Sequence, residues 1–364
     1  MKAIRTIAGD YNEDDIYNMD ETGLFWRMPP SQSLSSANRP GVKRDKSRIS
    51  VICCVNASGT DRLPVWVIGK ARMPRALRNV NIPAMGAEWR WNKKAWVDQI
   101  VMREWLLAFY SHIGKRAVLL TMDNFAAHLA GLELAPPPPN IRICWLPKNS
   151  TSQYQPLDQG IIQNIKIYYR KQWLKFILYH YECNQDPLQI VTLLDCIRWP
   201  VRAWNHDILS TTILACFYKS TLVLNPVQLP IESPNLSSLY GHVQQSGRLS
   251  NCMDIGNFLN PVEELLVVES EEELSSETLL EHLITGASNT GDVYNDDQED
   301  DSPEPAPLPK PLEDLNAVRL LISYMEGQDV SRASLLRSLE RLERDLESEI
   351  ITSRTQGTLD SWLR

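Results

Sequence analysis

The chain has 364 residues, of which 43% are hydrophobic, so it is long enough for one large domain or two ordinary ones. Residues 1–225 contain 28 lysines and arginines against 18 acids and the rest contains 9 against 27, so a basic globule precedes an acidic tail; the basic excess fits a phosphate-binding face or an ordinary solvated surface. The seven cysteines lack a C-x-x-C pair and no apolar run approaches the roughly 20 residues that span a bilayer, so we expect a soluble intracellular protein without a zinc site or a membrane partner.

The first predicted strands form an antiparallel start to a sheet. Residues 16–20 are typical of a short strand that ends at Asp20, and Gly23 permits a turn soon after it. Residues 47–70 contain two further apolar runs around a Ser-Gly-Thr-Asp cluster at residues 58–61, which suits a hairpin. Three strands in succession therefore predict antiparallel pairing.

The middle of the chain predicts covered strands followed by a long helix. Residues 117–123 (AVLLTMD) are apolar at nearly every position, as in a central strand covered on both faces, and they end on Asp123. Residues 141–147 form a similar, shorter run. Residues 156–181 have apolar side chains at helical spacing, and Asp158 lies near the start of this predicted helix.

Beyond about residue 225 the composition changes. Residues 291–311 are too acidic and too rich in proline to bury a core, so we expect disorder there. Apolar residues then recur at alternating steps of four and three between residues 335 and 350, which predicts a short helix with one apolar seam. This helix is expected to pair either with itself or with residues 315–325.

Three aspartates share a position at the edge of predicted elements. Asp20 and Asp123 each end a strand, and Asp158 lies beside a helix start. Convergent carboxylates repel one another unless a cation neutralises them, and hard divalent ions prefer oxygen ligands. Each acid taken alone is better explained as a surface residue or a helix cap, and Asp158 near a helix start suits the helix dipole.

Four segments in order resemble one known family. They are IYNMDETGLFW, KSRISVICCVNASGTDRLPVWVIGKARMPR, LLTMDNFAAH and IRICWLPKNSTSQYQPLDQGIIQNIKIYYR. Together they resemble the DDE endonuclease domain of the pogo/Tigger group of transposases, which includes the CENP-B and jerky-like proteins, and they look most similar to fungal pogo-type elements. The resemblance covers about residues 10–225.

The resemblance implies a fold, a site and a cofactor. It implies an α/β, RNase H-like mixed sheet with flanking helices, in which Asp20, Asp123 and Asp158 match the family's three catalytic carboxylates. These would hold two Mg²⁺ ions, for which Mn²⁺ can substitute, and would cleave DNA strands before a freed 3′ hydroxyl attacks target DNA. A nuclear location follows from a DNA substrate.

Other residues carry weaker predictions. Asn124 and His128 match the family motif and orient a ligand or touch a phosphate, although a structural histidine is an equal alternative. Glu21 should face away from Asp20 because side chains alternate along a strand, so we place it behind the ligands. Basic clusters are candidates for phosphate contacts or for a solvated loop: Lys43, Arg44, Lys46 and Arg48, and then Lys70, Arg72, Arg75 and Arg78.

The C-terminal residues 354–364 predict a docking motif. Gln356, Leu359 and Trp362 have the Q-x-x-L-x-x-aromatic spacing of segments that bind the DNA sliding clamp PCNA, and pogo-like transposases are associated with such a motif. Leu363 stands where a second aromatic is usual, which should weaken binding. A simple extension of the preceding helix is the alternative.

The sequence thus predicts five parts. They are a remnant N-terminal segment (1–15), a DDE domain (16–225), an acidic linker (226–312), a helical segment that forms a coiled coil in one interpretation (313–351), and the docking motif (354–364). The D-E-T-G motif begins at residue 20, which leaves no room for the helix-turn-helix domains expected before it. Two hypotheses follow: a DDE nuclease, or a truncated or domesticated nuclear protein that binds DNA or acts as a scaffold without catalysis.

Overall fold

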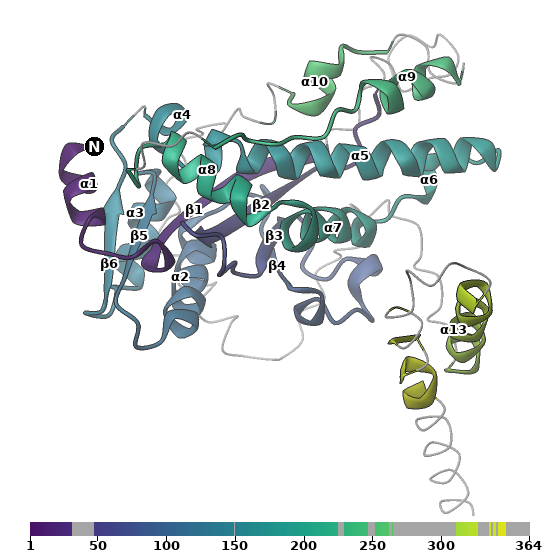
Figure 1. Cartoon of the computed structure of the whole chain (residues 1–364), viewed down its shortest axis with the longest axis horizontal. Coiled ribbons are helices and arrows are strands. Elements are labelled where there is room, and N and C mark those ends of the chain that lie inside the picture. Colours follow the sequence, from purple (N-terminus) through teal and green to yellow (C-terminus); the bar gives the residue numbers. More distant parts are fainter. Residues whose placement is uncertain are drawn as a thin grey trace, which may run out of the picture. The chain divides into compact units, whose positions relative to one another are not determined.

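The structure is a computed structural model of the chain (Figure 1). It describes residues 1–30, 47–148, 150–224, 229–246, 252–261, 264 and 311–326, and some positions between 335 and 346. The chain divides into two units, Met1–Glu304 and Pro305–Arg364, which are described separately. Among the described residues, none of the helices is both long and apolar enough to cross a membrane.

A six-stranded mixed sheet forms the centre of the first unit. Its strands stand in the order β4-β3-β2-β1-β5-β6 (Figure 1). Only β2 runs against its neighbours, because β5 is parallel to β1, β6 to β5 and β4 to β3. The bounds are β1 (Ile16–Phe25), β2 (Arg48–Asn56), β3 (Val65–Gly69), β4 (Ala87–Trp91), β5 (Val118–Met122) and β6 (Ile141–Trp145).

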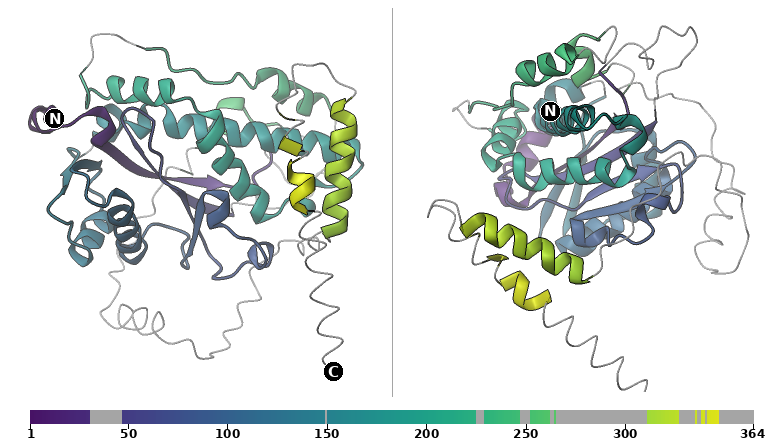
Figure 2. Two further views of the ribbon diagram at one scale, coloured as in Figure 1. Left: turned by 60° about the horizontal axis from the view of Figure 1, so that its bottom comes forward. Right: turned by 90° about the vertical axis from the view of Figure 1, so that its right-hand side faces the viewer.

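Helices cover both faces of this sheet (Figure 2). On one face Tyr17 and Met19 of β1 pack with the apolar side of α2 (Gln99–Ile113), beside α3 (Ala126–Leu134). On the other face Ile16 and Leu24 pack toward α5 (Ile161–Glu182), α7 (Leu193–Arg202) and α8 (Ser210–Lys219). All residues of β3 and β5 are buried, as expected for strands enclosed between two helical layers.

Short elements complete the two units. The helices are α1 (Lys2–Ala8), α4 (Thr151–Tyr154), α6 (Pro187–Ile190), α9 (Ser237–Gln245), α10 (Ile255–Leu259) and α13 (Pro311–Glu326). The tighter turns are η1 (Glu13–Asp15), η2 (Arg75–Leu77), η3 (Pro83–Met85) and η4 (Leu157–Gln159), and a π-helical turn, η5, spans Ala203–Asp207.

The predicted hairpin and the mixed sheet are confirmed, but the predicted end of the first strand is wrong. β1 continues past Asp20 and pairs with β2 as far as Phe25, opposite Arg48. Gly23 lies inside this strand, where an added Cβ would stand 2.8 Å from the carbonyl oxygen of Glu264. This glycine therefore serves a close packing contact and not the turn that we expected.

The compact unit also continues beyond the boundary expected at residue 225. Leu236, Tyr240 and Phe258 are buried against the preceding core, in a region that was assigned to a linker. The backbone N–H of Met253 donates to the carbonyl of Pro30 at 3.1 Å, and the Tyr240 hydroxyl donates to the same carbonyl. Apolar residues spaced along a mostly polar stretch were too few to predict this packing.

The second unit contains α13, on which Leu315, Val318 and Ile322 are buried. Residues 341–346 are also helical, and Arg319 of α13 forms a 2.8 Å ion pair with Glu343. This ion pair favours the alternative in which the C-terminal helix pairs with residues 315–325. The clamp-type motif with Gln356, Leu359, Trp362 and Leu363 lies outside the described residues.

Candidate active site

The register of β1 and β5 brings two of the predicted carboxylates level with each other. Ile16, Tyr17 and Asn18 pair with Leu119, Leu120 and Thr121 in parallel. Asp20 and Asp123 each come two residues after the last of these pairs, Asn18 and Thr121. They therefore stand at the same level of two neighbouring strands, which are spaced roughly 4.8 Å apart. Asp20 lies within β1, and Asp123 directly follows β5.

The third carboxylate, Asp158, is held beside them by a network of amide side chains. Asp158 lies in the turn η4, immediately before α5. The side-chain carbonyl of Asn18 accepts a 3.0 Å hydrogen bond from the backbone N–H of Leu157. The Asn18 amide in turn donates to Gln155, and Gln155 donates to the carbonyl of Met19, both within 3.1 Å. Asn18 and Gln155 thus fix the turn against β1.

The passage from this turn into α5 requires a glycine. Gly160 has φ 151° and ψ −12°, a conformation that residues with a side chain rarely adopt. The long helix therefore begins at Ile161 and not at residue 156, where we predicted its start. Asp158 belongs to a separate turn. Asp158 therefore lies outside α5, in a turn whose position is fixed by the hydrogen bonds of Asn18 and Gln155.

Burial and the charges of neighbouring acids raise the pKa of Asp20 and of Asp158. Burial is the largest cause of the high pKa of Asp20, followed by the charges of Asp158, Glu21 and Asp123, against a hydrogen bond from Gln155. Burial and the charges of Asp123 and Glu21 raise the pKa of Asp158 to about 6, although Lys166 acts in the opposite direction. Burial and the neighbouring acids disfavour the ionised forms of Asp20 and Asp158, and a bound cation would relieve this repulsion.

A buried histidine touches two of the acids. His128 of α3 is 0% exposed, and its Nδ1 lies 2.6 Å from Oδ1 of Asp123. Its Nε2 lies 3.0 Å from Oε2 of Glu21 without the alignment of a hydrogen bond, so that contact is electrostatic. Burial alone would lower the pKa of His128, but Glu21 and Asp123 outweigh it and raise the pKa well above its usual value.

The position of Glu21 follows from strand alternation. Glu21 shares the face of β1 that carries Tyr17 and Met19, toward α2 and α3, while Asp20 shares the face of Asn18, toward η4. Glu21 therefore lies on the opposite face of β1 from Asp20, as the alternation of side chains along a strand predicts. His128 is both a buried structural residue and a contact of a predicted ligand.

The donor chemistry of the site, which consists of carboxylate oxygens, fits a hard divalent cation. Carboxylate oxygens are the ligands that Mg²⁺ and Mn²⁺ prefer. Within the described part of the chain, however, no three His, Cys, Asp or Glu side chains stand together as a ready metal-binding group. Repulsion between the acids and the contact of Asp123 with His128 account for this spacing.

Comparisons with known proteins place the chain in a family. A model of the DDE superfamily endonuclease family matches residues 46–217. CENP-B homolog protein 2 of Schizosaccharomyces pombe is 32% identical over 96% of this chain and 68% of its own length. The chain belongs to the pogo/Tigger-type DDE superfamily. The human Jerky protein homolog (33% identity, 55% of this chain and 36% of that protein) is a further relative.

The chain spans about two thirds of the length of its fission-yeast relatives, 64% in the case of ARS-binding protein 1, which is 31% identical. Among solved structures, the Mos1 transposase paired-end complex with left transposon end is similar at a TM-score of 0.28 and 11% identity, over 60% of each chain. The RNase H-like fold of the superfamily agrees with the order and directions of β1, β2, β3, β5 and β6, to which β4 adds an edge strand.

The other predicted residues of this DDE domain are placed less decisively. Arg48 lies with its guanidinium 4.5 Å from the ring centre of Trp96 and 5.2 Å from that of Phe25, and burial lowers its pKa. Asn124 is partly buried in the turn between β5 and α3. Lys43, Arg44 and Lys46 lie outside the described residues.

Sequence reasoning missed a buried charge cluster next to the site. Glu264 is fully buried, accepts from Arg170 at 2.5 Å and from Lys166 at 2.9 Å, and receives the backbone N–H of Phe25 at 2.7 Å. Lys166 is thereby committed to Glu264 and offsets only part of the charge at Asp158. Glu264 stands 98 positions from Lys166 in an acidic stretch, which gave no signal of its burial.

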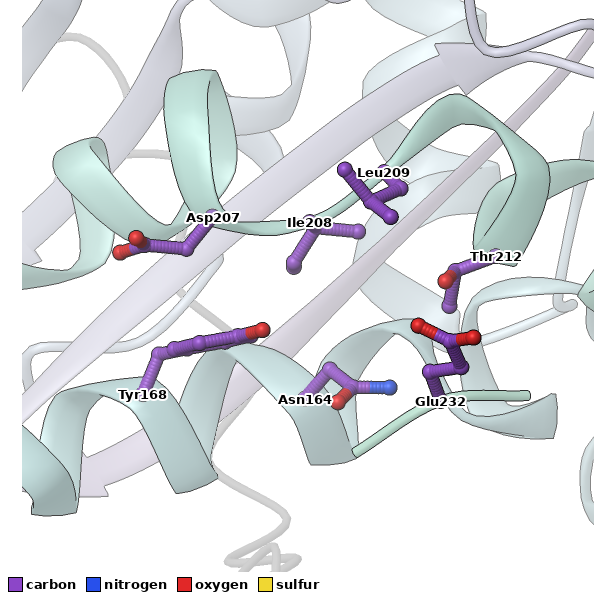
Figure 3. A pocket seen from close by; sticks show the side chains of 7 residues that line it. All are labelled: Asn164, Tyr168, Asp207, Ile208, Leu209, Thr212 and Glu232. Atoms are coloured by element: carbon purple, nitrogen blue, oxygen red, sulfur yellow. The ribbon is translucent and has the colours of Figure 1, made fainter. Parts of the chain in front are cut away.

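A small pocket between α5 and the segment that joins η5 to α8 is separate from this site (Figure 3). Asn164 and Tyr168 of α5 line it together with Asp207, Thr212 and Glu232. None of the three aspartates contributes to it. It offers two acids, Asp207 and Glu232, and therefore fewer than three metal-binding side chains.

Proposed function

We propose that this chain is a transposase-derived DDE domain that cleaves DNA strands and transfers the resulting ends. Asp20, Asp123 and Asp158 would hold two Mg²⁺ ions, with Mn²⁺ as a substitute. The observation that supports this most is the placement of Asp20 and Asp123 at one level of parallel strands, with Asp158 held beside them by Asn18. Burial and neighbouring acids raise the pKa of Asp20 and of Asp158, and a bound cation would relieve that repulsion.

When bound, a pair of divalent ions supplies Lewis acidity, a nucleophilic oxygen at neutral pH, and stabilisation of the leaving oxygen. The residues of the chain supply position. The buried β5 fixes the backbone before Asp123, and Gln155 with Asn18 fixes η4 and hence Asp158. A rigid scaffold of this kind is what a precise ligand set requires.

His128 would act as a positioning residue for Asp123. Its ring nitrogens lie 2.6 Å from the Asp123 carboxylate and 3.0 Å from that of Glu21. With one oxygen of Asp123 held by His128, the other oxygen would be available to a cation that Asp20 and Asp158 also hold. His128 contacts Asp123 and Glu21 and carries at most one positive charge, so negative charge on the four acids of the site remains for cations.

The test is nicking of supercoiled DNA by the purified protein with Mg²⁺ or Mn²⁺. Wild type is compared with Asp20→Ala, Asp123→Ala and Asp158→Ala, and with Glu133→Ala as a matched exposed acid on α3. We expect each aspartate variant to lose at least about 100-fold in rate, as for other groups that stabilise charge at the reacting centre. Equal nicking by all variants would refute the proposed site.

The alternative is a noncatalytic nuclear protein that binds DNA or organises partners. One contact favours it, because Nδ1 of His128 lies 2.6 Å from Oδ1 of Asp123 and this carboxylate therefore already has a partner within the chain. It would make Trp362 and the clamp-type motif the functional part. Wild-type protein that fails to nick DNA but binds purified PCNA, with Trp362→Ala abolishing that binding, would support this reading.

A further inference from the structure

The outer edge of the sheet at β4 is strongly basic. Residues 70–94 contain seven lysines and arginines and a single acid, Glu88, although the whole chain has a net charge of −8. Charge of one sign concentrated on a short segment marks a surface for a partner of the opposite sign. The segment combines the loop after β3 with β4 and the residues that follow β4.

The pairing of β3 with β4 brings Lys70, Arg72 and Lys93 close together. The two strands are parallel and Gly69 pairs with Trp91, so Lys70 and Lys93 emerge next to each other at the same end. The backbone N–H of Asn92 donates to the Gly69 carbonyl at 3.0 Å. The indole N–H of Trp89 donates to the carbonyl of Arg72 at 3.3 Å, which holds the loop along β4.

Four of the cations are exposed and uncommitted. Lys70, Arg72, Arg78 and Lys93 are exposed, and none of them forms an ion pair within the described residues. We call these four residues the basic edge.

The neighbouring charges are already neutralised by other contacts. Arg90 is paired with Glu104 at 2.6 Å and with Glu88 at 3.2 Å. Asp98 accepts a hydrogen bond from Asn92 and caps α2. The nearby acids are therefore engaged locally, and the positive charge of the basic edge remains available to a ligand.

Lys70, Arg72 and Lys93 of the basic edge lie beyond the level of Asp20, in the direction in which β1 runs. β1, β3, β4 and β5 all point in one direction, and the pairing of Asp20 with Cys53 and of Ile52 with Trp66 puts Val65 level with Asp20. Gly69 is four residues farther along, which is roughly 13 Å, and β4 is three strands from β1, which is roughly 14 Å. The separation is therefore roughly 20 Å, or about six base-pair steps of 3.4 Å.

We propose that the basic edge binds the phosphate backbone of duplex DNA beside the segment that reaches Asp20, Asp123 and Asp158. Lysine and arginine heads on an exposed strand edge match phosphates without reading bases, so the contact would be independent of sequence. Met73 and Trp91, 61% and 38% exposed, add apolar surface for the sugar edges. The inference rests on the proposed function only for its choice of DNA as the ligand.

The test measures DNA affinity without catalysis. Full-length protein carrying Lys70→Gln, Arg72→Gln, Arg78→Gln and Lys93→Gln is titrated with a fluorescent 30-base-pair duplex in EDTA, at salt concentrations from 50 to 200 mM. Each phosphate contact adds about 0.9 to the slope of log K against log salt. We expect the slope to fall by about 2–4 and the affinity at 100 mM salt to fall about tenfold or more.

A control variant removes equal charge elsewhere. Lys2→Gln, Lys115→Gln, Lys175→Gln and Arg198→Gln change four exposed cations outside residues 70–94. Affinity and slope close to wild type are expected for it, and thermal unfolding checks that both variants fold. An unchanged slope in the basic-edge variant, or an equal loss in both variants, overturns the inference.

Its failure is distinguishable from failure of the proposed function. Metal-dependent nicking by wild type, together with normal DNA binding by the basic-edge variant, removes the inference and keeps the nuclease. Loss of binding in that variant, together with a wild type that never nicks, keeps the DNA surface and removes the nuclease. The two readouts are independent because binding is measured in EDTA.

Discussion

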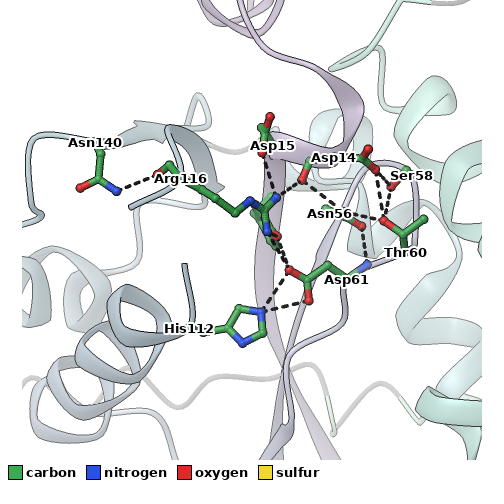
Figure 4. A network of polar contacts seen from close by, with 10 residues as sticks. Asp14, Asp15, Asn56, Ser58, Thr60, Asp61, His112, Arg116 and Asn140 are labelled. Atoms are coloured by element: carbon green, nitrogen blue, oxygen red, sulfur yellow. Dashed lines mark hydrogen bonds and ion pairs between the residues drawn. The ribbon is translucent and has the colours of Figure 1, made fainter. Parts of the chain in front are cut away.

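The two ends of the central sheet both gather carboxylates, but they neutralise them differently. At the end where β1 begins, Asp61 lies 3.0 Å from His112 and 3.2 Å from Arg116, and it also accepts from the Tyr17 hydroxyl (Figure 4). Arg116 also reaches Asp15 at 2.8 Å. Asp15 and Asp61 at this end each pair with a cation from the chain itself.

At the other end, the acids outnumber the cations. Glu21 and Asp123 share His128, while Lys166 acts on Asp158 only at a distance and is bound to Glu264. The pKa values record the difference, since the hydrogen bond from His112 helps to lower that of Asp61 to about 2 and burial with neighbouring acids raises that of Asp158 to about 6. The first end is a structural network, and the second retains charge for an added cation.

The largest effect is expected where an acid is fully compensated and fully buried. Glu264→Gln leaves Lys166 and Arg170 without their carboxylate inside the core. Breaking a buried ion pair on one side costs about 3–5 kcal/mol, so we expect a loss of that size in urea-induced unfolding at pH 7. Glu133→Gln, an exposed acid on α3, should stay within about 0.5 kcal/mol of wild type. A similar small change for both would mean that Glu264 is not needed in the packed core.

The second prediction compares one acid from each end. In EDTA at pH 7, Asp158→Asn should raise the free energy of unfolding by about 2 kcal/mol because it removes a carboxylate that burial and its neighbours disfavour. Asp61→Asn should lower it by about 1–2 kcal/mol because it removes the partner of His112 and Arg116. Changes of the same sign in both variants would contradict the comparison between the ends.

Much of the acidic end was predictable because local sequence carries it. An apolar run that stops on Asp123 marks a buried strand and its end, and the D-E-T-G and Q-P-L-D segments mark Asp20 and Asp158 by family resemblance. The separation of 103 positions between Asp20 and Asp123 equals the offset of the β1–β5 register. The sequence alone does not predict this register, because the parallel pairing of β1 with β5 depends on contacts between distant residues.

The remaining parts depend on long-range packing that local patterns do not encode. β4 reads as a short polar and aromatic stretch, and its pairing with β3 is a tertiary choice. Asn18 and Gln155 act through their amide groups across 137 positions, and Glu264 is buried only because two cations of α5 meet it. The end of β1 was missed for a related reason, because Gly23 suggested a turn where it permits close packing.

The third prediction tests whether the excess charge accepts a cation. At a free Mn²⁺ concentration of about ten times the dissociation constant, binding should add about 1.4 kcal/mol to the stability of wild type. Asp123→Asn should lose this increment, because it removes a ligand from the acidic end. Asp61→Asn should keep it despite its lower starting stability, and equal increments in the two variants would place the ion elsewhere.

The smallest expected effect tests the compensated end through pH. The hydrogen bond to Asp61 raises the pKa of His112, while burial and Arg116 act in the opposite direction. A raised pKa in the folded state means that the stabilisation is fully present below about pH 6.5 and is lost as the pH rises through the folded value. Wild type should therefore exceed His112→Gln by up to about 1 kcal/mol at pH 5.5, the size expected of a partly exposed pair. The difference should shrink toward zero at pH 9, while His206→Gln, an exposed histidine outside the network, controls for loss of an imidazole. A difference that grew with pH would show that His112 works there as a neutral residue and that Arg116 and Tyr17 alone hold Asp61.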